Sequence, residues 1–380
     1  MLLLKGFEIE LFTGTSQGEI VSLSDKIVTN IDGFQQEIDR RFVEYTTVPN
    51  SRYEQLLLDL IQPRMQLRQF LQCLGDYTLI PGSTLSLAGS DRFFRSDPDS
   101  LYHSLLEQSY GTKLVTASIH INIGIEDPEL LMRAIRLIRV ESPLYLALSA
   151  ASPFLDGVPT GYHSTRWQMF PKTPAFVPLF ETHAHFIDWT NCQLQAGIMQ
   201  SVRHLWCSVR PNGPSRPDYL NRVELRICDF IADPKVLLAV TALLEARLWQ
   251  LIANPKLDPL VASILPATTR AQDLIDITQT NEQLAAERSL DAQLRHWRDG
   301  KSILAREWIA EIYHEVWAIA QQQGISHFLA PLRNILSEGN TAQQWLKLHN
   351  RGIECQDILK RAIAQMIQQE RELESRFITC

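Results

Sequence analysis

Apolar and polar residues alternate along the first stretch of the chain, residues 3–12, and this alternation predicts a strand. Side chains of an extended chain point to opposite faces in turn. The apolar face carries Phe7, Ile9 and Leu11. The other face carries Glu8 and Glu10, two strand rises or about 7 Å apart. Such a pair is typical of the solvated face of an amphipathic strand, and it also suits two metal-holding carboxylates on a rigid strand.

Two later stretches repeat the alternation, and each leads into the same kind of helix start. Residues 113–125 carry Thr116, Ser118, His120 and Asn122 on the polar face. Residues 221–229 carry Arg222, Glu224, Arg226 and Cys228 there. Asp127-Pro128 and Asp233-Pro234 follow, with the aspartate as N-cap and the proline in the first turn. The repetition suggests two related strand–helix halves around one site.

Shorter signals predict the elements between these strands. Residues 19–23 and 42–48 have strand composition, and the second run contains Glu44. Ser51-Arg52-Tyr53-Glu54 matches a capping box at the start of a helix that runs to about Gly75. A further helix is expected over residues 191–204.

Helical periodicity dominates the chain beyond Asp229. We therefore expect an α+β fold in which helices pack on a sheet. The sheet-containing catalytic core would span residues 1–230. A mostly helical region, residues 231–380, would pack on that core as part of one integrated domain.

Composition narrows the class of protein. The 380 residues carry a net charge of −7 and are 45% apolar, so we expect binding to neither nucleic acid nor membranes. The start of the chain lacks the pattern of a secretory signal, and the most apolar stretch, Leu144 to Ala151, is shorter than a membrane span. Six scattered cysteines without a Cys-x-x-Cys pair indicate reduced thiols and a cytoplasmic protein.

The polar strand faces together predict a site for hard cations. Several carboxylates with one imidazole and no cysteine suit Mg²⁺ or Mn²⁺ better than zinc. Metal ions held in this way commonly bridge nucleotide phosphates, and Arg226 would share the face as a phosphate clamp. A lone strand histidine is usually structural, and a lone Glu-x-Arg is usually a surface ion pair. Three strands with the same polarity favour the site.

Two other motifs resemble functional sites, but their surroundings in the sequence argue against that interpretation. Gly300-Lys301-Ser302 resembles the end of a P-loop, but Arg295 stands where that loop needs glycine. His183-x-His185 could be a metal pair of barrel hydrolases, which require repeated strand–helix units that the helical chain beyond Asp229 does not provide.

A series of motifs resembles the glutamate–cysteine ligase family, in its bacterial and cyanobacterial form within the carboxylate–amine ligases. The motifs follow the family order through about the first 230 residues. They are Gly6–Glu10, Glu44–Pro49, Gly82–Leu87, Tyr110–Thr112, Ser118–Gly124, Leu148–Phe154, Thr160–Tyr162 and Val223–Asp229.

The resemblance implies a curved, mainly antiparallel sheet of about six strands with helices packed on it, similar to the catalytic part of glutamine synthetase. It also implies an ATP-dependent reaction. ATP would phosphorylate the γ-carboxylate of glutamate, and the amine of cysteine would then attack, giving γ-glutamylcysteine in the first step of glutathione biosynthesis.

Roles carried over by motif fall on the polar strand faces. Mg²⁺ would be held by Glu8, Glu10, Glu37, Glu44, His120 and Glu224, with Asp39 as an alternative to Glu37. Arg226 would contact the phosphates, and Glu224 and Arg226 would act in catalysis. Arg210 and Arg166 would bind phosphate or a substrate carboxylate. Two alternatives stay open: a ligase with another amine acceptor, and a nucleotide- or metal-binding relative without turnover.

Overall fold

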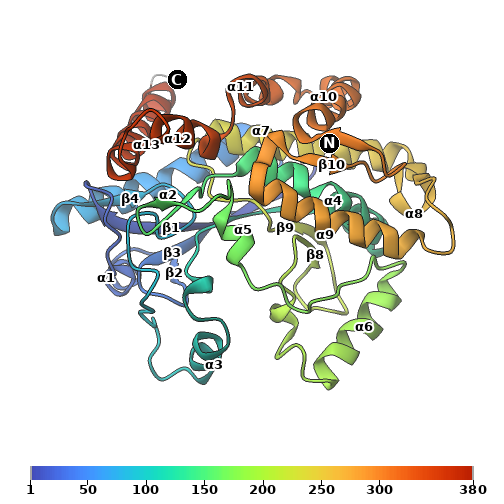
Figure 1. Ribbon diagram of the computed structural model, residues 1–380, viewed down its shortest axis with the longest axis horizontal. Helices are drawn as coiled ribbons and strands as arrows, with labels where there is room; N and C mark the ends of the chain where they lie inside the picture. The colour runs from blue at the N-terminus through green and yellow to red at the C-terminus, as the bar shows by residue number, and fades with distance from the viewer. Residues whose placement is uncertain (1, 379–380) are drawn as a thin grey trace.

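Within residues 2–378, which a computed structural model of the chain describes, seven strands form one sheet (Figure 1). The strand order is β2-β3-β1-β5-β9-β8, β4 also pairs with β1, and every pair is antiparallel. The strands are β1 (Lys5–Thr15), β2 (Phe34–Gln36), β3 (Phe42–Thr46), β4 (Tyr77–Ile80), β5 (Ile119–Gly124), β8 (Val209–Asn212) and β9 (Arg222–Leu225). The predicted α+β fold with an antiparallel sheet is confirmed.

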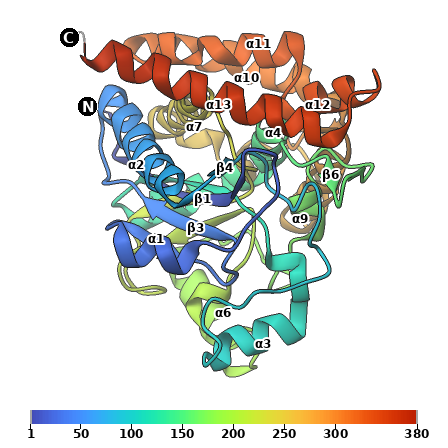
Figure 2. The same ribbon diagram turned by 90° about the vertical axis from the view of Figure 1, so that its left-hand side faces the viewer.

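Three long helices cover the apolar face of this sheet: α2 (Tyr53–Leu74), α4 (Pro128–Ser149) and α7 (Pro234–Ala253) (Figures 1 and 2). Phe7, Ile9 and Leu11 of β1 are each 1% exposed and belong to the core on this side. The carboxylates that alternate with them in sequence therefore lie on the opposite face.

Further helices form a layer on the side of α2 and α7 that faces away from the sheet (Figure 2). They are α10 (Ala305–Gln322), α11 (Ala330–Glu338), α12 (Thr341–His349) and α13 (Cys355–Ile378). Helix α9 (Arg270–Arg288) packs beside α4, and β10 (Gln293–Arg295) pairs with β11 (Ser302–Leu304). One core cluster runs from Phe7 to Met366, so the C-terminal helices share a core with the sheet.

The polar face of the sheet looks toward two projecting arms, α3 (Leu101–Tyr110) and α6 (His183–Gln195) (Figure 1). Shorter elements complete the fold. They are α1 (Ser24–Asn30), α5 (Thr165–Met169), α8 (Pro259–Ala262) and the hairpin of β6 (Phe154–Leu155) with β7 (Val158–Pro159).

Both predicted Asp-Pro helix starts are confirmed. The Asp127 side chain accepts a hydrogen bond from the Leu130 N–H at the start of α4. The Asp233 side chain accepts one from the Lys235 N–H at the start of α7. Since α4 follows β5 and α7 follows β9, the two helices leave neighbouring strands of the sheet.

Three local predictions are wrong. Residues 19–23 form only an isolated bridge at Ile20 and then lead into α1. The Ser51 capping box does not form, because Arg52 is the N-cap of α2 and offers no capping hydrogen bond. The helix expected over residues 191–204 is displaced: α6 begins after Thr182, which caps the His185 N–H, and Gly197 with a φ of 69° follows its end.

Helix α7 is long and apolar enough to cross a membrane, which contradicts the prediction that Leu144 to Ala151 is the most apolar stretch. Within the structure, 72% of its apolar window is buried. A helix buried on all sides in a core has the same composition as a membrane span. The packing of α7 between the sheet and the C-terminal helices accounts for its apolar character.

Candidate metal and nucleotide site

The strand register brings the predicted site residues together on the polar face. Glu8 of β1 lies opposite His120 of β5, and Glu10 lies opposite Glu44 of β3. Glu224 of β9 is flanked by Asn122 of β5 and Arg210 of β8. Because side chains directly opposite each other on one face are close neighbours, these pairings gather the carboxylates into two groups.

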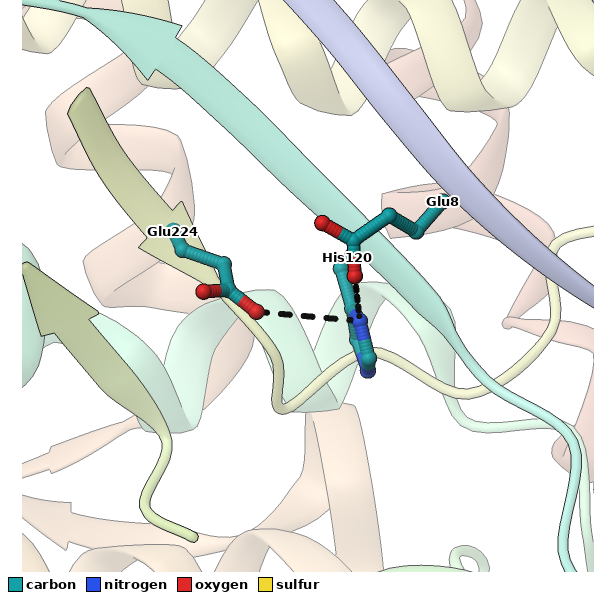
Figure 3. A group of neighbouring side chains, drawn as sticks. All are labelled: Glu8, His120 and Glu224. Carbon is teal, nitrogen blue, oxygen red and sulfur yellow. Dashed lines mark hydrogen bonds and ion pairs between the residues drawn. The ribbon is translucent and has the colours of Figure 1, made fainter. Parts of the chain in front are cut away.

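The first group, which we call the paired cluster, consists of Glu8, His120 and Glu224, whose ligand atoms all lie within 4.8 Å of one another. His120 lies between the two carboxylates in Figure 3. Its Nδ1 atom is 2.7 Å from Glu8 Oε2 and 3.8 Å from Glu224 Oε1. Each residue comes from a different strand, so the sheet itself fixes the geometry.

Arginines neutralise Glu224, which is fully buried. Arg210 donates to both carboxylate oxygens, at 2.7 and 3.0 Å, and Arg226 donates to Oε1 at 2.5 Å. Burial raises the pKa of Glu224, but the charges of Arg210 and Arg226 outweigh it and hold the pKa well below its ordinary value. Burial also opposes ionisation of Glu8, but the hydrogen bond with His120 leaves its pKa lowered. Glu8 and Glu224 are therefore both ionised at neutral pH.

The second group, the acidic cluster, consists of Glu10, Glu37 and Glu44, again with ligand atoms within 4.8 Å of one another. Burial, followed by repulsion from Glu10 and Glu8, raises the pKa of Glu44 to about 8. Burial and repulsion from Glu10 and Glu44 hold the pKa of Glu37 well above its ordinary value. Like charges this close cannot all ionise without a cation between them.

Polar side chains that received no role in the sequence analysis orient the ligands. The Ser118 N–H and hydroxyl both donate to Glu10 Oε2, at 2.6 and 2.7 Å, and the same hydroxyl lies 3.2 Å from His120 Nε2. Asn122 donates to Glu8 Oε1. Asn212 donates to Glu224 Oε2 at 2.6 Å. Ser118, directly before β5, and Asn122 within it alternate in step with His120, and this alternation is the signal that could have identified their role.

Two predicted residues have protein partners. The Arg166 guanidinium donates to Asp229 Oδ1 at 2.9 Å and to the carbonyls of residues 226–228. Asp39 is fully buried and forms an ion pair with Arg41 at 2.8 Å, so Glu37 and not Asp39 completes the acidic cluster. The proposed role of Arg166 in binding an anion stays a prediction.

A cavity of about 240 Å³ opens beside the carboxylates. Its lining includes Glu10, Glu37, His120 and Arg226, and also the aromatic residues Trp167, Phe170 and Trp206. The Trp167 ring is stacked on Phe170, with 6.2 Å between centroids and 12° between planes. Trp167 Nε1 is buried and has no hydrogen-bond acceptor among residues 2–378. The cavity is thus lined by both anionic and aromatic residues.

The two motifs set aside earlier lie outside this constellation. His183 Nε2 is 2.9 Å from the Pro217 carbonyl oxygen, and His185 Nδ1 accepts from the Glu181 N–H. Gly300-Lys301-Ser302 lies at the turn between β10 and β11, so it forms no strand–loop–helix phosphate cradle. Residues before this turn form a strand, whereas the sequence indicated a helix.

The donor set fits hard divalent cations. It consists of five carboxylates and one imidazole; each cluster includes a partly exposed carboxylate, and Glu10, Glu37 and His120 line the cavity. Carboxylate oxygens are the ligands that Mg²⁺ and Mn²⁺ prefer, and the mutual repulsion within the acidic cluster is what a bound cation relieves. All described cysteines are free thiols, and none belongs to either cluster; Cys380 lies outside the described residues.

Comparison with known proteins gives a consistent result. The family described as glutamate–cysteine ligase family 2 matches residues 4–369. A protein of Sorangium cellulosum is 30% identical over 235 residues, which cover 61% of this chain and 59% of that protein. One of Solibacter usitatus is 28% identical over 280 residues, covering 72% and 67%. Both carry the name glutamate–cysteine ligase 2 provisionally.

Solved structures share the fold at low sequence identity. The glutamate–cysteine ligase of Francisella tularensis in complex with AMP superposes with a TM-score of 0.73 and 15% identity, covering 99% of this chain and 92% of that one. The bifunctional glutathione synthetase of Pasteurella multocida gives a TM-score of 0.72 with 14% identity and covers 99% and 53%. At such identities the likeness concerns the fold.

Proposed function

The chain belongs to glutamate–cysteine ligase family 2, and we propose that it joins the γ-carboxylate of glutamate to the amine of cysteine at the cost of ATP. The observation that carries this proposal is the pair of adjoining three-ligand clusters, the paired cluster and the acidic cluster, with Arg226 and an aromatic-walled cavity beside them. Two divalent cations bridging phosphates beside an arginine are a recurring arrangement in phosphoryl transfer.

The chemistry divides into two steps. A γ-carboxylate oxygen of glutamate attacks the terminal phosphorus of ATP, the bond to the β-phosphate oxygen breaks, and ADP leaves. The cysteine amine then attacks the carbonyl carbon of the acyl phosphate, inorganic phosphate leaves with the bonding electron pair, and the amine loses a proton. Both steps bring anions together, so a site that catalyses them must supply positive charge.

Mg²⁺ or Mn²⁺ would be held by the two clusters and would offset the negative charge of the phosphates. Arg226 contacts the paired cluster and lines the cavity: it donates to Glu224, and its Nη1 is 3.2 Å from His120 Nδ1. Its guanidinium is positioned to turn toward a phosphate oxygen once cations take up the carboxylates. The aromatic lining of the cavity would suit a planar heterocycle such as a purine; it consists of Trp167, Phe170 and Trp206.

The contact between His120 and Ser118 favours the histidine tautomer that metal ligation would require. If His120 Nε2 carries the proton, it donates to the Ser118 oxygen, and the Ser118 hydroxyl donates in turn to Glu10. In the metal-free protein Nδ1 lies 2.7 Å from Glu8 Oε2, a contact that needs a proton between the two atoms, and a cation held by Glu8 and Glu224 would replace that proton and take the Nδ1 lone pair. A hydrogen bond on the second ring nitrogen commonly fixes a ligating histidine in this way. Glu10 and His120 are thus coupled through Ser118, which links the two clusters.

The setting of the reaction follows from its thiol substrate. Since the five described cysteines are free, we place the protein in a reducing compartment such as the cytoplasm, where γ-glutamylcysteine would serve glutathione synthesis.

An assay of ADP release tests the proposal. Purified protein with ATP and Mg²⁺ should form ADP only when glutamate and an amine are both present, with cysteine the best of a panel of amino acids. ADP release that is independent of glutamate would contradict the proposal. Preference for another amine would instead identify a carboxylate–amine ligase with a different acceptor, and the absence of turnover with intact nucleotide binding would identify a non-catalytic relative.

A further inference from the structure

A tightly packed loop between β8 and β9, residues 213–221, presents an arginine that none of the roles above uses. The loop backbone is closely packed: a Cβ atom on Gly213 would lie 2.2 Å from the Tyr219 carbonyl oxygen. The Tyr219 N–H donates to the Ser215 carbonyl at 2.7 Å. The Pro217 carbonyl is anchored to His183 of α6 by a 2.9 Å hydrogen bond. Arg216 is therefore carried by a well-supported backbone.

The guanidinium of Arg216 lacks a protein partner within residues 2–378. Its Nη1 atom is buried, and none of the described residues accepts a hydrogen bond from it. Neighbouring arginines differ in this respect, since Arg210 and Arg226 both donate to Glu224. Arg216 as a whole is partly exposed, but a buried cationic N–H without an acceptor costs free energy, and its retention calls for an explanation.

The charges around Arg216 are unbalanced toward the positive side. Burial, then the charge of Arg210, lowers the pKa of Arg216 to about 10. Arg226 and Arg222 add to the repulsion, and Glu224 opposes it. Glu224 already neutralises two arginines. Arg222 is bonded to amide oxygens of Asn122 and Asn221, which carry no charge. An incoming anion would complete this arrangement.

We propose that Arg216 is a substrate-binding residue that takes an anionic oxygen group, a phosphate or a carboxylate, at the β8–β9 end of the paired cluster. The guanidinium fork matches both groups in geometry and charge. The identity of the substrate rests on the proposed function, in which the phosphates of ATP and the α-carboxylate of an amino acid are the two sources of such a group.

If Arg216 binds a substrate anion, its loss should weaken anion binding without destabilising the fold. An arginine that serves the fold stabilises it, whereas one reserved for a ligand is a cost to the ligand-free protein. Replacing Arg216 by glutamine removes a partly buried charge and its repulsion from Arg210. Arg216→Gln should therefore melt at the same temperature as the wild type or higher in chloride buffer, and bind one class of anion at least about tenfold more weakly, about 1.4 kcal/mol.

The experiment uses thermal unfolding and calorimetric titration of the full chain with three probes: inorganic phosphate, ADP with Mg²⁺, and glutamate. Loss confined to phosphate and ADP assigns Arg216 to the nucleotide; loss confined to glutamate assigns it to the amino acid. Arg216→Lys keeps the charge but not the fork, so it should recover part of the lost affinity. Arg133→Gln, an exposed arginine of α4, is the matched control and should change neither quantity.

Two results overturn the proposal. A lower melting temperature of ligand-free Arg216→Gln would assign the residue to the fold. Unchanged affinity of the variant for all three probes, or a wild type that binds none of them, would remove the anion site. The phosphate titration needs no turnover, so a wild type that binds phosphate through Arg216 but forms no ADP would refute the proposed reaction and leave the anion site standing.

Discussion

The paired cluster and the acidic cluster lie side by side on one sheet face, but their negative charges are neutralised in different ways. In the paired cluster, Arg210 and Arg226 hold the pKa of Glu224 well below its ordinary value. In the acidic cluster, burial and mutual repulsion raise the pKa of Glu44 to about 8. The paired cluster is therefore balanced by the protein, whereas the acidic cluster is balanced by protons or cations. Stability should depend on the first and metal-linked chemistry on the second.

The largest effect is expected from Glu224→Gln, because it breaks both functions of the paired cluster. Arg210 and Arg226 would remain buried beside a neutral amide. Breaking a buried ion pair from one side costs about 3–5 kcal/mol. Denaturant unfolding should show a loss of that order, together with loss of ADP formation. A Glu224→Gln variant as stable as the wild type would show that the ion pairs of the paired cluster do not stabilise the fold.

Glu10→Gln should separate activity from stability. The amide oxygen of glutamine can still accept from the Ser118 N–H and hydroxyl, which now bond Glu10. Only the charge is lost, so the fold should remain intact while glutamate-dependent ADP formation falls by about 10³-fold or more.

Glu19→Gln, on an exposed carboxylate at the surface, is the control and should behave as the wild type in both measurements. Near-normal activity of Glu10→Gln would mean that Glu10 holds no metal and is an ordinary polar residue of an amphipathic strand.

A pH-dependent gain in stability is expected for Glu44→Gln in metal-free protein. A carboxyl whose pKa is raised on folding stabilises the fold below its unfolded pKa of about 4.5, and this contribution is lost as the pH rises to about 8. Between these two pH values, the free energy of unfolding of the variant should therefore rise relative to that of the wild type. The difference should reach up to a few kcal/mol, at about 1.4 kcal/mol per pKa unit.

Unfolding at pH 5 and pH 8.5 in the presence of a chelator measures this difference. Added Mg²⁺ should stabilise the wild type more than Glu44→Gln, because the cation takes over the role of the proton. A difference that does not change with pH would mean that repulsion does not govern the acidic cluster.

The alternation of side chains was sufficient to predict which residues share the polar face. Glu8, His120 and Glu224 lie on three strands far apart in sequence, and period-two patterning assigned each to the correct side. What patterning cannot supply is the register that pairs Glu10 with Glu44, or the ion pair with Arg41 that keeps Asp39 out of the acidic cluster. Register depends on long-range pairing that no single strand encodes.

Local helix signals were less dependable, for physical reasons. Ser51 lost its capping role because the chain is still extended at Arg52 (φ −90°, ψ 122°), so α2 starts one residue later than a box at Ser51 requires. The apolar character of helix α7 was missed in the sequence. Its apolar residues are explained by burial in the core and not by a membrane. The partners Ser118 and Asn212, and the unpartnered Arg216, were missed because their importance lies in what they contact or fail to contact.

The most direct test of the contrast between the clusters is the number of protons released when metal binds. Titration of Mg²⁺ at pH 7 in buffers of different ionisation enthalpy gives this number. The wild type should release protons from the acidic cluster, and Glu44→Gln should release fewer while Glu19→Gln matches the wild type. Equal release by the wild type and Glu44→Gln, or a wild type that binds no metal, would contradict the account.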